Sequence, residues 1–564
     1  MACSEATPDT DYVDFHPVLE EFDAVWGQRV PQTMPELQKV FDFQPAGLKE
    51  MFAVYNMDQA AFFKDTLPFV VKAAASLRKH LPTCRLKKLE QGSSDEVTIP
   101  RPTGLALLAH MFLCTTCNMP LAAQRYMPEN SFVRMLRNRH SAEVAKLRMV
   151  VEFFNTVMEE GVEYLSGELR IYRQARGLQE AGADSTEMWR KSERKLLEME
   201  VQQMRVGFED AGDDCVHADF ANKMLGGGVL SGGCVQEEIR FAICPELIVA
   251  MLVCPVMLDH EAIFVVGAQQ FSDYKGYGYG LKFAGRHRHE NGVRRDADGT
   301  PLVAIAAMDA LDYRYEDNAL YVQMQPSHML RELEKATAAF TPVNEEHLRQ
   351  WEKVATGNWG CGVFRGFTPL KAMLQWLAAS QGERKLVYFP FDEPIRDDLL
   401  DVSQLLTQQQ EATVGQLFGA VLELAQEANT PEGAARLHSN FFDLLRQKFL
   451  NAPQAPTDTF PLESQRPSVR SFKNDSTSEL AMPPVAERGE SKLPPEEPWT
   501  PQQGNLQLQV HSPGATAPLD GIVETRRRSL LASLCGMLSR VPQMLGIARR
   551  YEVAQEPLAQ SSMQ

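Results

Sequence analysis

The chain has 564 residues, of which 44% are hydrophobic, so it can bury a large core and form more than one domain. Lys and Arg number 57 against 74 Asp and Glu, which gives a formal net charge of −17. This balance excludes general attraction to a polyanion, so we expect no direct nucleic-acid binding and a local site for any anionic substrate. Ten scattered cysteines lack the spacing of a zinc site or a disulfide frame, which predicts free thiols, no metal and a reducing compartment.

The first 200 residues predict a mostly helical accessory region. Apolar residues recur at helical intervals over 57–81 and 103–117, and Pro68 is expected to kink or split the first of these helices. A longer pattern at 141–174 has an apolar stripe formed by Leu147, Val150, Val151, Phe154, Val157, Met158 and Val162. Such a stripe is typical of core packing, so we assign no chemistry to this region.

From about residue 200 the pattern changes to short β-rich runs separated by helical stretches. Strands are expected at 215–220, 262–267, 302–308, 353–357 and 385–389, and helices at 236–247, 329–340 and 370–379. Strands that alternate with helices predict an α/β layer fold with ligands at the strand ends. Helical patterns resume over 396–450, so we take 201–450 as one domain.

Composition changes again after this domain. Residues 451–522 are rich in Pro, Ser, Glu and Gln, which predicts a disordered linker. Residues 523–564 contain Arg526, Arg527 and Arg528 before an apolar segment, which predicts either a helix packed on the body or a basic targeting or partner-binding helix. A basic loop that begins at Arg286 is expected to be solvated or to touch a long polyanion.

The most informative stretch is 226–238, in which five glycines precede Gln236, Glu237 and Glu238. Glycines allow positive φ and let N–H groups converge on an anion, so they predict a phosphate cradle or, alternatively, a long flexible turn. The stretch lacks the ending of a nucleotide-hydrolase P-loop and the context of a Rossmann fingerprint. Two adjacent Glu suit the first turn of a helix, where they point about 100° apart and take different tasks. Burial and like charge are expected to raise the pKa of one of them, as the acid in glycoside cleavage requires.

This glycine run followed by Gln-Glu-Glu resembles the signature of the poly(ADP-ribose) glycohydrolase family. Further segments at 216–222, 274–277, 355–362 and 387–391 match the family in the same order, across roughly residues 100–395. The resemblance implies an α/β macrodomain, a three-layer α/β/α module with a mixed sheet, behind an N-terminal mostly helical accessory domain.

The resemblance also implies the reaction, which is hydrolysis of ribose–ribose O-glycosidic bonds of poly(ADP-ribose) without a cofactor or metal. The expected partners are the polymer and poly(ADP-ribosyl)ated proteins. Glu238 is the expected general acid and base of an oxocarbenium-like process. Glu237 would bind ribose hydroxyls, and Asp219 would orient the ribose or the catalytic Glu.

Substrate-binding residues follow from the same resemblance. Gly226, Gly227 and Gly228 would wrap the diphosphate, while Asn222 and Gln236 would bond ribose hydroxyls. Tyr277 and Phe391 would sandwich the adenine, and Phe208 and Glu209 would contact its edge. The loop of Asn358, Trp359, Gly360, Cys361, Gly362, Val363 and Phe364 would close over the distal ribose and phosphate.

Two other functions remain possible. A macrodomain reader would bind ADP-ribose without cleaving it, although such a reader has no need for adjacent acids at Glu237 and Glu238. Removal of mono-ADP-ribose from a side chain is the second. We expect a nuclear, or alternatively cytoplasmic, monomer without a signal peptide or membrane span, because the longest apolar run is about half of the ~20 residues that a span requires.

Overall fold

The computed structural model describes residues 11–27, 29–119, 126–176, 185–203, 211–212, 214–290, 292–390 and 393–451. All of these residues belong to one compact unit, residues 1–459. The segments 451–522 and 523–564 lie outside the described residues except for Asn451, so the predictions for them stay predictions. Within the described ranges, no helix is long and apolar enough to cross a membrane.

An eight-stranded mixed sheet forms the centre of this unit, in the order β3-β4-β7-β10-β6-β11-β12-β5. The strands are β3 (Asp95–Pro100), β4 (Glu168–Ala175), β5 (Met199–Val201), β6 (Cys215–Asp219), β7 (Glu261–Val266), β10 (Ala304–Ala307), β11 (Lys353–Gly357) and β12 (Lys385–Phe389). β3, β4, β7 and β10 pair antiparallel, whereas β10, β6, β11, β12 and β5 pair parallel. The remaining described strands form two antiparallel pairs, β1 (Tyr12–Asp14) with β2 (Arg85–Lys87) and β8 (Ser272–Lys275) with β9 (Lys282–Arg286).

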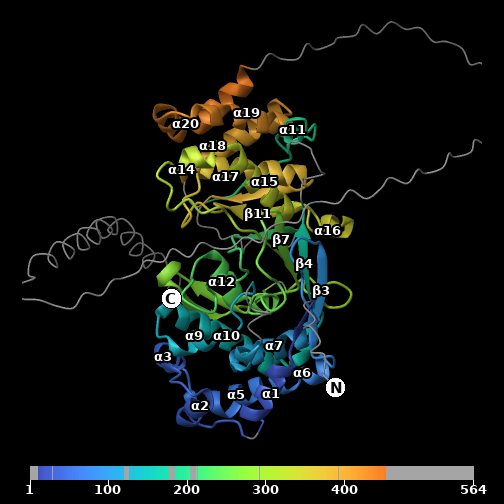
Figure 1. Cartoon of the computed structure of the whole chain (residues 1–564), viewed down its shortest axis with the longest axis vertical. Coiled ribbons are helices and arrows are strands. Elements are labelled where there is room, and N and C mark those ends of the chain that lie inside the picture. The colour runs from blue at the N-terminus through green and yellow to red at the C-terminus, as the bar shows by residue number, and fades with distance from the viewer. Residues whose placement is uncertain are drawn as a thin grey trace, which may run out of the picture. The chain divides into compact units, whose positions relative to one another are not determined.

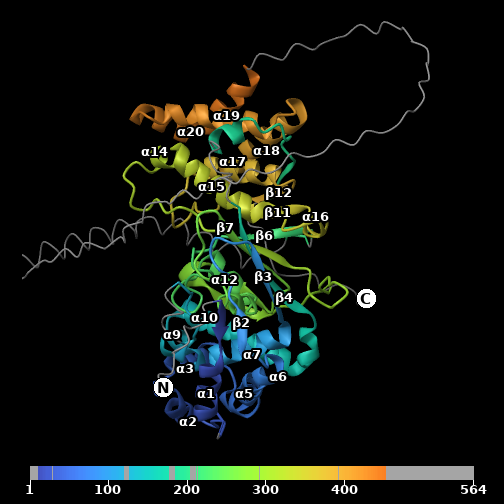
Figure 2. The same cartoon turned by 45° about the vertical axis from the view of Figure 1, so that its right-hand side comes forward.

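Side chains alternate between the two faces of the sheet, so each face buries its own core. On β7, Ile263 and Val265 join one hydrophobic cluster, while Phe264 and Val266 join the other. The first cluster contains the N-terminal helices with α12 and α13, and the second contains α15 and the helices after it. In Figure 1 the blue helices lie on one side of the sheet and the orange helices on the other, and Figure 2 keeps that order. The predicted three-layer α/β/α fold is confirmed.

Helices supply both outer layers. The first layer has α1 (His16–Val25), α2 (Met34–Phe41), α3 (Ala46–Val54), α4 (Gln59–Ala61), α5 (Leu67–Ala75), α6 (Leu77–His80), α7 (Arg101–Phe112), α9 (Val133–Arg137), α10 (Ser141–Glu160), α12 (Gln236–Ile243) and α13 (Leu247–Ala250). The second layer draws on α11 (Ser185–Arg190), α14 (Ala319–Gln323), α15 (Pro326–Phe340), α16 (Glu345–Gln350), α17 (Thr368–Gln381), α18 (Glu393–Gln404), α19 (Val414–Glu427) and α20 (Pro431–Leu450).

The five predicted strands form close to their expected bounds, but the N-terminal part differs from the prediction. The helix expected at 141–174 ends at Glu160, because Gly161 has a φ of +88° that a helix cannot continue. β4 follows and pairs with β3, so this region adds antiparallel strands to the sheet as well as helices. Pro68 splits its helix as predicted: a π-helical turn, Phe62–Thr66, precedes α5. The domain boundary placed at residue 200 stays a prediction. β3, β4 and the first residue of β5 lie before it and belong to the same sheet as the later strands.

Candidate active site

Three carboxylates meet at the carboxyl edge of the parallel strands. Asp219 is the last residue of β6, and Glu237 and Glu238 lie in the first turn of α12. All three are buried, with exposed fractions of 0% for Asp219, 2% for Glu237 and 7% for Glu238. Glu238 is therefore the most accessible of the three to a ligand.

A loop of residues 226–235, here called the glycine loop, folds back onto these acids. The N–H of Gly226 donates to Oε1 of Glu237 at 2.6 Å, and the N–H of Gly228 donates to Oε1 of Glu238 at 2.9 Å. The N–H of Asn222 completes the bonding of Glu237 at 2.8 Å, and that of Val235 bonds Oε2 of Glu238 at 2.9 Å. The sequence predicted that these N–H groups face a bound phosphate, but Gly226 and Gly228 donate theirs to the two glutamate side chains.

Close packing explains the glycines at positions 227 and 233 of the loop. Gly227 has a φ of +48°, and a Cβ there would lie 2.5 Å from Oε2 of Glu237 and 2.6 Å from Oε1 of Glu238. A Cβ on Gly233 would lie 2.5 Å from the same Glu238 oxygen. Any side chain at these two positions would displace the acids, so the glycines set how closely the backbone approaches them.

The acids sit in an environment that favours protons. Burial, together with the nearby charges of Asp219 and Glu238, raises the pKa of Glu237 well above its usual value. Burial and the charge of Glu238 raise the pKa of Asp219 to about 8, against the lowering effect of Arg240. Neither oxygen of Asp219 has a hydrogen-bond partner among the described residues. The sequence predicted a raised pKa for one of the two glutamates, and the structure gives it at Glu237 and, in addition, at Asp219.

Lys146 binds carbonyl oxygens of the glycine loop, whereas the two glutamates accept from its N–H groups. This residue lies on α10 and is fully buried. Its Nζ donates to the carbonyl oxygens of Gly228 at 3.0 Å, of Ser231 at 2.8 Å and of Gly233. Sequence reasoning missed Lys146, although a lysine between the apolar residues Ala145 and Leu147 of a predicted core helix was a usable signal.

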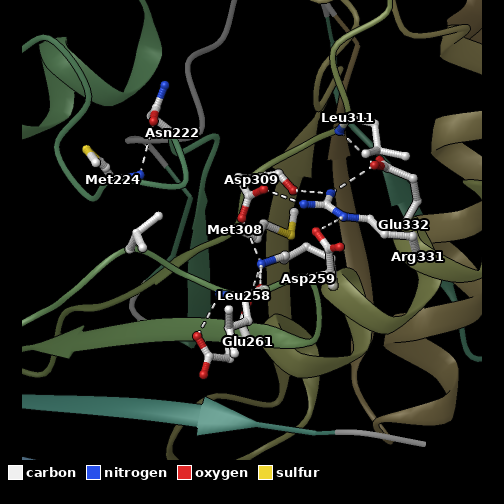
Figure 3. A network of polar contacts seen from close by, with 12 residues as sticks. Asn222, Met224, Leu258, Asp259, Glu261, Met308, Asp309, Leu311, Arg331 and Glu332 are labelled. Atoms are coloured by element: carbon white, nitrogen blue, oxygen red, sulfur yellow. Dashed lines mark hydrogen bonds and ion pairs between the residues drawn. The ribbon is translucent and has the colours of Figure 1, made fainter. Parts of the chain in front are cut away.

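Gln236 and Asn222 also lie beside the acids. Oε1 of Gln236 accepts a 2.7 Å bond from the N–H of Phe220, which ties α12 to the end of β6. Its Nε2 is buried and has no partner among the described residues. Oδ1 of Asn222 accepts from the N–H of Met224 at 3.0 Å within an exposed turn, as Figure 3 shows.

The loop 358–366 follows β11, the strand next to β6, and therefore leaves the same edge of the sheet. Asn358 accepts a 2.8 Å bond from the buried Tyr388 hydroxyl, while Gly362 and Val363 are exposed. Gly360 adopts a φ of +72°, and burial raises the pKa of the Cys361 thiol to about 12. Phe364 is half-buried. The structure thus places six predicted residues on one loop that leaves the same edge of the sheet as Asp219.

Trp359 is an exception to the predicted binding loop. Its side chain is fully buried, and its Nε1 donates to the carbonyl of Met308 at 3.1 Å. The Lys371 ammonium lies 3.4 Å from the ring centroid. The indole therefore anchors the loop in the core, which leaves the backbone of Trp359 for any substrate contact, and the predicted role of this residue stays a prediction.

A network of charged side chains, buried or nearly buried except for Asp259, supports this loop. Arg331 binds Asp309, Asp259 and Glu332, as Figure 3 shows, with distances of 3.0 Å to Asp259 and to Glu332. Glu332 also pairs with Lys371 and accepts a 2.8 Å bond from the N–H of Leu311. Since Lys371 lies against Trp359, the network connects β10, α15 and α17 to the loop.

The remaining predicted residues are not brought to the acids by any contact described above. Tyr277 lies between β8 and β9 with 53% of its surface exposed. Phe208, Glu209 and Phe391 lie outside the described residues. In the basic loop, Arg286 pairs with Glu152 at 2.7 Å and with Glu159 at 2.8 Å, so its charge is already neutralised.

Within the described ranges, no three or more His, Cys, Asp or Glu side chains are grouped so that they could hold a metal ion. The arrangement offers proton transfer by three clustered carboxylic acids, two of which are held in place by backbone N–H groups. An α/β/α fold that carries such acids at the carboxyl edge of its sheet defines a ligand-binding module of the macrodomain type with a site suited to acid–base chemistry.

Comparison with known proteins identifies the family. A model described as the macro domain fold of poly(ADP-ribose) glycohydrolase matches residues 186–397, and a second, described as its helical domain, matches residues 54–168. Together they match more than half of the chain. The chain belongs to the poly(ADP-ribose) glycohydrolase family.

Curated relatives agree with this assignment. Poly(ADP-ribose) glycohydrolase 1 of Caenorhabditis elegans is 32% identical over 58% of this chain and 40% of its own length. Poly(ADP-ribose) glycohydrolase 1 of Arabidopsis thaliana is 30% identical over 57% of this chain and 68% of its own. Poly(ADP-ribose) glycohydrolase 2 of Caenorhabditis elegans is 30% identical over 64% and 70%. A solved poly(ADP-ribose) glycohydrolase variant from Deinococcus radiodurans, in complex with ADP-ribose, covers 46% of this chain and 95% of its own, at 15% identity and a TM-score of 0.23. The family rests on the models and the curated relatives.

Proposed function

We propose that this chain hydrolyses the ribose–ribose O-glycosidic bonds of poly(ADP-ribose) and releases ADP-ribose. One observation carries the proposal: in a chain of this family, adjacent Glu237 and Glu238 lie buried against the glycine loop at the carboxyl edge of the sheet. Two acids at one place suit the cleavage of a bond between two sugars, because one can act on the bond while the other binds the sugar.

Glu238 is the general acid of the proposed mechanism. It is the most accessible carboxylate of the cluster, and two backbone N–H groups fix its orientation. It protonates the departing ribose oxygen as the anomeric carbon–oxygen bond breaks. It then accepts a proton from the water that bonds to the oxocarbenium-like carbon. Positioned proton transfer contributes about 10² to 10⁴ in rate.

Glu237 and Asp219 support this step. Burial raises the pKa of both side chains, which favours their protonated forms. A protonated Glu237 can donate to a ribose hydroxyl, and the unpartnered carboxyl of Asp219 can orient the ribose or Glu238. Gly227, the remaining loop residues, Asn222 and Gln236 are then the candidates for the diphosphate and ribose contacts. Tyr277, Phe391, Phe208 and Glu209 are the candidates for adenine.

Release of product distinguishes this activity from the alternative reader. Purified full-length protein is incubated with labelled poly(ADP-ribose), and free ADP-ribose is measured by chromatography. Steady release supports the proposal, and binding without release would identify a reader. A protein that carries a single ADP-ribose unit serves as a second substrate. We expect that unit to stay attached, and its efficient removal would count against the assigned bond.

We further expect the protein to act as a nuclear monomer on poly(ADP-ribosyl)ated proteins. The arginine-rich segment 523–564 is the candidate address, which lies outside the described residues. Imaging of a fluorescent fusion with and without 523–564 tests the location, and loss of nuclear signal is expected on removal. Nuclear retention without the segment would assign the address elsewhere.

A further inference from the structure

Helix α10 belongs to the N-terminal helical layer, yet its residue Lys146 touches the glycine loop. The Lys146 side chain is fully buried, and among the described residues no carboxylate pairs with it. Its partners are three carbonyl oxygens of the loop, those of Gly228, Ser231 and Gly233. Burial lowers the pKa of this ammonium to about 8, against the attraction of Glu238 and other nearby groups.

A buried ammonium group destabilises a folded protein unless it is compensated by partners. Burying an unpaired charge costs several kcal/mol, and a methionine would occupy the same volume without that cost. The carbonyl bonds recover part of the cost only while the loop keeps its present shape. Lys146 and the loop conformation therefore stabilise each other.

Two of the three carbonyls that Lys146 binds belong to residues that touch Glu238. Gly228 is held from two sides, because its N–H donates to Oε1 of Glu238 and its carbonyl accepts from Lys146. Gly233 approaches the same oxygen so closely that a Cβ there would lie 2.5 Å from it. Fixing these two glycines fixes the orientation of the Glu238 carboxylate.

The same helix also supports the predicted adenine segment between β8 and β9. The Ser141 hydroxyl donates to the carbonyl of Tyr279 at 3.2 Å, and the His140 ring contacts the Tyr279 ring at 4.9 Å. The Arg148 guanidinium lies 4.1 Å from the centroid of Phe283 on β9. One rigid helix thus carries contacts to both segments.

We propose that Lys146 is a positioning residue for Glu238, through which the helical layer completes the catalytic apparatus. The proposal rests on the hydrolase activity proposed above. It gives the helical layer a part in the active site, because the lysine that binds the three loop carbonyls lies on α10.

The test compares Lys146→Met with Lys146→Arg in the full-length chain. Methionine keeps the stem and removes the donors, so we expect kcat to fall about 10- to 100-fold, as when a catalytic group is misplaced by about 1 Å. KM should change much less than kcat. Arginine keeps the charge but presents a wider head, so its kcat should lie between those of wild type and Lys146→Met. If Lys146→Met does not fold, Lys146→Arg decides, and a wild-type kcat would then overturn the proposal.

Arg101→Met is the matched control for lost stability. Arg101 is another fully buried cation of the helical layer, and it binds Glu246 and the carbonyl of Ser166 rather than the glycine loop. We expect this variant to lose stability and to keep the wild-type kcat per folded molecule. Equal losses of kcat in Arg101→Met and Lys146→Met would show a merely structural role and overturn the proposal, as would a wild-type kcat in Lys146→Met.

Hydrogen exchange of residues 226–235 measures the positioning without any turnover. Faster exchange is expected in Lys146→Met and not in Arg101→Met, and unchanged exchange in Lys146→Met would overturn the proposal. This readout separates two failures. A wild-type protein that releases no ADP-ribose refutes the hydrolase activity, whereas the exchange result still decides whether Lys146 holds the loop.

Discussion

Oε1 of Glu238 accepts a 2.9 Å hydrogen bond from the backbone N–H of Gly228, ten residues earlier in the chain. The bond closes the glycine loop onto the first turn of α12, and Oε2 of the same carboxylate bonds the N–H of Val235. Two fixed donors hold the carboxylate in one orientation before any ligand arrives. Preorganisation of this kind is what a general acid requires.

Replacing Glu238 by Gln is expected to remove turnover and keep binding. The amide has nearly the same shape but cannot exchange the proton, so kcat should fall by about 10² to 10⁴. ADP-ribose affinity, measured by calorimetry, should stay near that of wild type. Glu346→Gln, at an exposed first-turn glutamate of α16, is the control and should keep full activity. Parallel loss of affinity and kcat would indicate that Glu238 is structural.

Gly227→Ala is expected to destabilise the protein and displace both acids. The φ of +48° costs about 1–2 kcal/mol for a residue with a Cβ, and the contacts with Glu237 and Glu238 add about 1–3 kcal/mol of overpacking. Gly92→Ala isolates the first effect, since Gly92 has a φ of +78° and open space around its Cβ position. Denaturant unfolding should show the larger loss for Gly227→Ala. Equal losses of unfolding free energy in the two variants would mean that Glu237 and Glu238 move away from the new methyl group at no cost, which would contradict the prediction.

The stability of the wild-type protein should fall as pH rises through the titration of Asp219. The folded-state pKa of about 8 exceeds the usual 3.8, so between these values the folded protein holds a proton that the unfolded chain releases. Asp219→Asn removes this contribution, and the raised pKa of Glu237 acts with the same sign in both proteins. Relative to wild type, the variant should gain about 2 kcal/mol or more between pH 5 and pH 8. Urea unfolding at both pH values measures the gain, and a constant difference would contradict it.

Lys371→Met is expected to loosen the loop that carries Trp359. The change removes the ion pair with Glu332 and the ammonium above the indole ring, at a cost of about 3 kcal/mol for a broken buried pair. Adding Glu332→Gln should cost less than the sum of the single changes by about 1 kcal/mol or more. Thermal and chemical unfolding of the four proteins measure this coupling.

The exposed pair of Lys448 and Glu423 supplies the control for that cycle. Lys448 Nζ lies 2.9 Å from Oε2 of Glu423, and the two side chains are 33% and 60% exposed. Because solvent screens such a pair, Lys448→Met should lower the free energy of unfolding by less than about 1 kcal/mol. Strict additivity of the Lys371 and Glu332 changes would show that the buried pair does not act as a unit.

The sequence by itself determined the local elements and the order of the motifs. Strand and helix periods depend on neighbouring residues, so β6, β10, β11 and β12 and the start of α12 were predicted near their observed positions. The alternation of strands and helices also predicted ligands at the strand ends, which is where Asp219 and Asn358 lie. Adjacent Glu237 and Glu238 needed only their own spacing to be recognised as an acid pair.

Tertiary structure decided what depends on residues far apart in the chain. Whether β3 and β4 join the sheet, whether Trp359 faces the core, and where Lys146 points are set by packing between distant segments, for which local periodicity holds no signal. The partners of the glycine-loop N–H groups also depended on the fold: composition allowed these groups to converge on a phosphate, but in the structure Gly226 and Gly228 donate to Glu237 and Glu238. The physical reason is that a buried polar group takes whichever partner the surrounding core leaves within reach.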